Sequence, residues 1–237
     1  MNLFSSAGAE LLLRWLHFLS GITWIGLLYY FNFVQGPFFA EADAATRSAA
    51  TQRLVPRALW WFRWSAALTF LSGALIIAKR FGEAPAGTSV ATSPWGEAIL
   101  TGALFGTVML INVWGVIWRN QKVVIANAVA TAGGGQANPA AAGAARRAFL
   151  ASRTNVVFSI PMLFFMGAAT HMPPGPITHG GMYWALLLVI VALVEINSLT
   201  AASGATTKPI EKIPGVIVTG FVLWAVVFAL VKFLLTA

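Results

Sequence analysis

The sequence contains no cysteine among its 237 residues. It can therefore form no disulfide, no thiolate metal site and no iron–sulfur cluster, and no c-type haem can be attached through a C-x-x-C-H motif. Charged residues are scarce too, at 9%, where soluble domains carry roughly a quarter. Only three histidines are present, so a metal site must use histidine, carboxylate or methionine.

Hydrophobic residues make up 58% of the chain and gather in stretches of about 20 residues, the length that crosses a bilayer. The pattern predicts an all-α, polytopic membrane helix bundle of about six transmembrane helices, forming one transmembrane domain over residues 1–237. Gly36-Pro37 is expected to end the first helix, because such a pair breaks helical structure. The predicted helices lie near 10–35, 56–79, 96–118, 153–172, 182–202 and 213–235.

Basic residues are scattered between the apolar stretches, although the net charge is +8. This distribution indicates lipid headgroups rather than nucleic acid as the partner. Three arginines lie between the first two helices, and more basic residues occupy residues 119–152, an Ala-rich hairpin around Gly133-Gly134-Gly135. The positive-inside rule makes that hairpin cytoplasmic and both termini periplasmic. We therefore expect a multi-pass protein of a bacterial inner membrane.

Two of the histidines are predicted to lie at one depth. Eighteen residues separate His17 from Gln35, and eighteen separate Arg153 from His171, so both histidines are expected about 27 Å from the cytoplasmic edge. Gly21 and Gly167 each lie one turn from a histidine and remove bulk from its helix face. Two imidazoles at one depth on different helices are typical of a bis-histidine b-type haem.

A structural interpretation remains open for these residues. His17 can hydrogen-bond a neighbouring helix, His171 can cap the last turn of its own, and the glycines can be close-packing positions. His179 lies in a loop, where a solvated role is expected. The sequence predicts no catalytic residue, phosphate loop, nucleophile triad or paired carboxylates.

A second set of polar residues is predicted in the cytoplasmic half of the bundle. Glu195 is an acid deep in an apolar stretch, and a bare carboxylate in hydrocarbon is costly, so it must face the interior. The residues expected at a comparable depth are Arg63, Asn112, Asn155 and Asn197. They indicate either a network that holds helices together or a proton path or small polar binding site.

Four stretches resemble the N-terminal membrane domain of the bacterial cytochrome-c-linked urate oxidase family. They are Leu-Leu-Arg-Trp-Leu-His-x5-Thr-Trp-Ile-Gly around His17, Trp-Phe-Arg-Trp at 61–64 with Leu71-Ser72-Gly73, residues 102–123 with Asn-Gln-Lys-Val at their end, and Ser-Ile-Pro-Met-Leu-Phe-Phe-Met at 159–166 followed by His171. The first stretch also resembles the opening helix of protoporphyrinogen-oxidase-type membrane proteins, whose histidine is a haem ligand. This second resemblance favours haem at His17.

The resemblance implies a membrane-embedded electron-transfer subunit with heme b on His17 and His171. The family's cytochrome c module needs cysteines that this sequence lacks, so the implied partner is a separate periplasmic c-type cytochrome, beside other membrane subunits. Two alternative functions remain open. The first is a haem-free structural or accessory subunit of a larger respiratory complex. The second is a urate-oxidase-like membrane enzyme, an oxidoreductase whose substrate would contact Asn112, Asn155 and Glu195.

Overall fold

The computed structural model describes residues 3–175, 178–200 and 203–235, and within them it has helices and connecting segments but no strand. The all-α prediction is confirmed. Three short π-helical turns, η1 to η3, continue longer helices. In chain order the elements are α1 (Ser6–Tyr29), η1 (Tyr30–Gln35), α2 (Gly36–Glu41), α3 (Ala44–Arg53), α4 (Val55–Gly82), α5 (Pro94–Ile111), η2 (Asn112–Ile117), α6 (Trp118–Ala132), α7 (Ala141–His171), α8 (Gly180–Thr200), α9 (Lys208–Glu211), α10 (Ile213–Leu230) and η3 (Val231–Leu235).

Six helical segments of the described chain are long and apolar enough to cross a membrane. The shortest has 21 residues and so spans about 30 Å, the thickness of a hydrocarbon core. Large apolar side chains cover the outside of the bundle: Phe18, Ile22 and Phe233 are 67%, 71% and 69% exposed. Such a surface suits lipid and not water. The chain is a multi-pass membrane protein.

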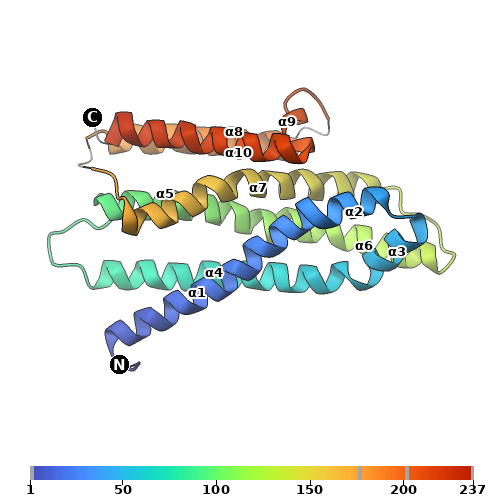
Figure 1. Cartoon of the computed structure of the whole chain (residues 1–237), viewed down its shortest axis with the longest axis horizontal. Coiled ribbons are helices and arrows are strands. Elements are labelled where there is room, and N and C mark those ends of the chain that lie inside the picture. Colours follow the sequence, from blue (N-terminus) through green and yellow to red (C-terminus); the bar gives the residue numbers. More distant parts are fainter. Residues whose placement is uncertain (1–2, 176–177, 201–202, 236–237) are drawn as a thin grey trace.

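Helix α7 lies at the centre of the bundle, between α5 and α10 (Figure 1). It also contacts α1, α6 and α8, and most of its side chains are buried. Gly102 of α5 allows a close approach, because a Cβ there would lie 3.0 Å from Met166 Cγ and 3.2 Å from the Met162 carbonyl oxygen of α7. Small residues at such crossings let membrane helices pack backbone to backbone.

Both ends of the described chain lie at one end of the bundle, here named the terminal end, together with residues 83–93, 172–175 and 178–179 (Figure 1). The opposite end, here named the basic end, carries α2, α3, α9 and the turn that joins α6 to α7. The short helices and the helix ends there carry most of the basic side chains: Arg47, Arg53, Arg57, Arg119, Lys122, Arg146, Arg147, Lys208 and Lys212.

The helix boundaries depart from prediction mainly at the basic end. Gly36-Pro37 does not end the first helix, which continues through η1 and α2 to Glu41. Pro37 lies at the start of α2, directly after the π-helical turn η1, and the helix continues past it. The hairpin 119–152 is mostly helical, with α6 and the early turns of α7 flanking the connection at 133–140. The end expected for the fifth helix, residue 202, lies outside the described residues, whereas α8 ends at Thr200.

Candidate functional site

His17 packs against α4. Its Nδ1 lies 2.9 Å from the carbonyl oxygen of Thr69 and 3.2 Å from Ser72 Oγ. A carbonyl oxygen can only accept, so Nδ1 carries the proton and Nε2 keeps its lone pair. Gly73 makes this possible, since a Cβ there would lie 2.9 Å from His17 Cε1. The imidazole is thus held in the tautomer that metal-bound histidines use, with Nδ1–H on a backbone carbonyl.

His171 has different surroundings, because it is exposed at the last residue of α7. The two histidines are nevertheless equally far from one contact between their helices, the 2.9 Å hydrogen bond that joins Tyr29 to Ser159. Tyr29 is twelve residues after His17, and Ser159 is twelve before His171, so both histidines lie about 18 Å from that contact along their helices. The two histidines are thus equally far along their helices from that contact, while their common depth and the bis-histidine pair stay predictions.

Gly21 and Gly167 differ as His17 and His171 do: the first of each pair packs against α4, and the second is open. A Cβ on Gly21 would lie 3.7 Å from Thr69 Cγ2, so Gly21 belongs to the packing of α1 on α4. A Cβ on Gly167 would meet nothing within 4 Å, and this glycine faces open space beside α7. His179 is exposed, with Nδ1 3.0 Å from Thr178 Oγ1. Among the residues that the structure describes, no three metal-ligating side chains of the His, Cys, Asp and Glu types form a group.

Asn112, Asn155 and Glu195 come together from three elements. Asn112, at the start of η2, donates both amide hydrogens, one to Asn155 Oδ1 at 3.0 Å and one to Glu195 Oε2 at 2.9 Å. Asn155 of α7 donates in turn to the Met109 carbonyl at 3.0 Å. Asn112 and Asn155 are buried, at 1% and 0% exposed. These hydrogen bonds tie α5, α7 and α8 together, as expected of a network that holds helices.

Arg63 and Asn197 lie outside this cluster. The Arg63 guanidinium stacks over the Trp118 ring, 3.9 Å from its centroid, and the described residues contain no ion pair between Arg63 and Glu195. Asn197 donates to the Thr206 carbonyl at 3.1 Å, near the basic end. Arg63 and Asn197 were expected at the depth of Glu195, but their side chains have other partners.

The structure buries two charged residues that the sequence did not single out as site residues, because both lie near predicted helix ends. Arg153 is 5% exposed, and its Nε and Nη1 atoms have no hydrogen-bond partner. Glu97 is 2% exposed, and its Oε2 atom likewise has none. The apolar sequence on both sides of each residue was the signal that could have indicated their burial. Both helices run past the predicted ends, α7 beginning at Ala141 and α5 at Pro94.

A family model described as urate oxidase N-terminal matches residues 87–230, more than half of the chain. The chain belongs to this family. Comparison with curated proteins and with solved structures gives no match. The matched part of the urate oxidase N-terminal family runs from the connection before α5 into α10, so it includes Glu97, the Asn112–Asn155–Glu195 cluster and His171. His17 and α4 lie outside it.

Proposed function

We propose that this urate oxidase N-terminal family chain is a membrane-embedded electron-transfer subunit that binds heme b, which His17 and His171 would hold. When bound, the haem would supply a one-electron carrier within the bilayer. The partner we propose is a periplasmic c-type cytochrome, because the chain itself has no cysteine for such a cofactor. The terminal end would then face the periplasm of a bacterial inner membrane, with other membrane subunits alongside.

The observation that carries this proposal is the environment of His17. The Thr69 carbonyl accepts a hydrogen bond from Nδ1–H, so the lone pair needed by an iron is available on Nε2. Ser72 Oγ supports the same orientation, because its own proton is donated to the Leu68 carbonyl at 2.7 Å and its lone pairs face Nδ1. The same hydrogen bond also holds α1 to α4, but only a ligand role uses the lone pair on Nε2.

A difference in how the two histidines are held sharpens the proposal. His17 is fixed from α4, whereas His171 ends its helix and is exposed. His17 is therefore the ligand whose loss should cost most, and His171 the one that another ligand can replace. Open space beside Gly167 leaves room for a flat macrocycle next to α7.

A pyridine haemochrome spectrum of protein purified after expression with haem supplied tests the proposal. We expect a b-type band that is absent from His17→Ala, shifted or weakened in His171→Ala, and unchanged in His179→Ala, the matched control. Equal melting temperatures of the apoproteins would show that His17→Ala still folds. Absence of the band from the wild-type protein would overturn the proposal and leave the haem-free accessory subunit as the better function.

A further inference from the structure

Glu97 is buried, at 2% exposed, and it differs in its partners from the acidic residues of the described chain that form ion pairs or cap a helix. Glu10, Glu83 and Glu211 each form an ion pair with lysine or arginine, and Asp43 caps α3 by accepting from the Thr46 backbone N–H. Glu97 has no such basic partner in the described chain, although basic residues outnumber acidic ones by 15 to 7. Its Oε2 atom is buried without a hydrogen-bond donor, which is costly for a carboxylate.

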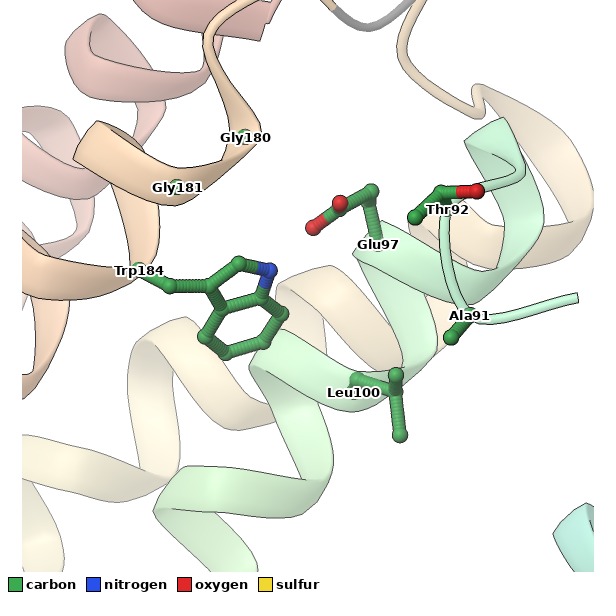
Figure 2. Close-up of a pocket in the computed structure, with 7 residues that line it drawn as sticks. All are labelled: Ala91, Thr92, Glu97, Leu100, Gly180, Gly181 and Trp184. Carbon is green, nitrogen blue, oxygen red and sulfur yellow. The ribbon is translucent and has the colours of Figure 1, made fainter. Parts of the chain in front are cut away.

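The Glu97 side chain points into a pocket at the terminal end (Figure 2). The pocket has a volume of about 490 Å³, within the range of small-molecule sites. It lies between the connection 83–93, the first turns of α5 and the first turns of α8, and the residues lining it are Ala91, Thr92, Glu97, Leu100, Gly180, Gly181 and Trp184.

The lining of this pocket has one acid and no base. Trp184 and Glu97 point toward each other from α8 and α5, with the indole nitrogen on the side of the carboxyl group (Figure 2). Leu100 adds an apolar wall, and a Cβ on Gly181 would meet nothing within 4 Å, so the α8 side is open. A ligand that enters here finds a single negative group beside the Trp184 indole and the apolar side chain of Leu100.

We propose that this pocket binds a small organic cation, whose ammonium group donates a hydrogen bond to Glu97 Oε2 while its apolar part lies against Leu100 and Trp184. Such a ligand supplies both the missing donor and the missing positive charge. A buried carboxylate paired in this way gains a charge-assisted hydrogen bond, which is stronger than a neutral one. This proposal is independent of haem, because the pocket involves neither His17 nor α4.

The position of Glu97 near the start of α5 does not account for these features by itself. A helix N-terminus favours an acidic side chain within its first turn. Ser93, however, already caps α5 by accepting from the Gly96 N–H at 3.0 Å. The helix terminus therefore explains why an acid is tolerated, but not why a buried carboxylate oxygen next to a pocket lacks a donor.

The test is the thermal stability of the detergent-purified protein with increasing benzylammonium, compared with benzyl alcohol, a neutral molecule of the same shape. A ligand that binds only the folded state raises the melting temperature as its concentration passes the dissociation constant. We expect benzylammonium to stabilise the protein and to bind at least about tenfold more tightly than benzyl alcohol, in keeping with a charge-assisted hydrogen bond.

Two variants assign the effect to the pocket. Glu97→Gln should weaken benzylammonium binding by at least about tenfold while the protein without ligand melts no lower, because a costly buried charge is gone. Gly181→Leu should block binding by filling the open side while it leaves the charge in place. Glu83→Gln, at the same end but exposed and paired with Lys79, should bind benzylammonium as the wild type does.

Three results would overturn the proposal. They are the absence of stabilisation by benzylammonium, equal stabilisation by benzyl alcohol, and an undiminished response in Glu97→Gln. If the ligand-free melting temperature of the wild type depends on pH and that of Glu97→Gln does not, with no ligand response in either, then a proton alone occupies the site.

Discussion

Breaking the hydrogen bond between Asn112 and Glu195 should test whether the Asn112–Asn155–Glu195 cluster holds the bundle together. Glu195→Leu removes the acceptor that lies 2.9 Å from Asn112 Nδ2, whereas Glu195→Gln keeps an oxygen in its place. Asn112 would retain its bond to Asn155 but lose its second acceptor. We therefore expect Glu195→Leu to destabilise the protein and Glu195→Gln to leave it near wild-type stability.

The size of the effect follows from burial. Hydrogen bonds between membrane helices contribute about 0.6 kcal/mol on average and up to about 1.7 kcal/mol. Asn112 is 1% exposed, so its freed N–H cannot reach water, and a buried donor without a partner costs about 1–3 kcal/mol. We expect Glu195→Leu to lower the free energy of unfolding by about 1–3 kcal/mol. A double-mutant cycle with Asn112→Leu should give a coupling free energy of about 1 kcal/mol.

Reversible unfolding in mixed micelles, titrated with a denaturing detergent, measures these free energies. The control cycle combines Asn112→Leu with Glu83→Gln, which lies at the terminal end and should be additive with it within about 0.5 kcal/mol. Additivity within the same margin for Asn112 and Glu195 would refute the reasoning. Equal destabilisation by Glu195→Gln and Glu195→Leu would instead assign the effect to the charge of Glu195.

Three further predictions concern single sites. Gly73→Ala places a Cβ 2.9 Å from His17 Cε1 and should destabilise the protein by about 1–3 kcal/mol in the same unfolding assay, whereas Gly26→Ala, with nothing within 4 Å, should not. Arg153→Met should leave the free energy of unfolding unchanged or raise it by about 1–4 kcal/mol, because the guanidinium is buried without a hydrogen-bond partner on Nε or Nη1. A large loss of stability in this variant would reveal a partner. The Arg146 guanidinium lowers the pKa of Glu211 below its usual value, so this pair stabilises the folded state above the usual glutamate range and the contribution is lost as the pH falls through the lowered pKa. Melting temperatures of the wild type and Glu211→Gln should therefore differ most near neutral pH and converge in acid, and a constant difference would contradict this.

The helices were predictable because an apolar stretch of about 20 residues has one stable solution in a bilayer, a helix that satisfies its own backbone. The grouping of Asn112, Asn155 and Glu195 followed from depth, which the sequence gives by counting residues. Direction around the helix axis does not follow from depth. Arg63 was expected near Glu195, but it projects from α4 toward Trp118 and stacks there instead.

Helix ends were the other source of error, and they concealed the two buried charges. Residues near a predicted boundary are read as exposed, because loops and interfaces tolerate charge. Arg153 was placed at the start of a helix that in fact begins twelve residues earlier, at Ala141. Glu97 is the second residue of the helix predicted over 96–118, whereas α5 begins at Pro94. Sequence alone does not reveal how tertiary packing covers the first turns of a helix.

The structure divides the candidate features between two parts of the bundle. At the level of His17, α1 contacts α4, whereas the hydrogen bonds to α7 from Tyr29 of α1 and Asn32 of η1 lie nearer the basic end. Glu97 and Glu195 instead belong to the part made of α5, α7 and α8, within the family match. A haem held by His17 and His171 would join these two parts near the terminal end. Loss of haem should therefore leave the response of the Glu97 pocket intact, and the two proposals can fail separately.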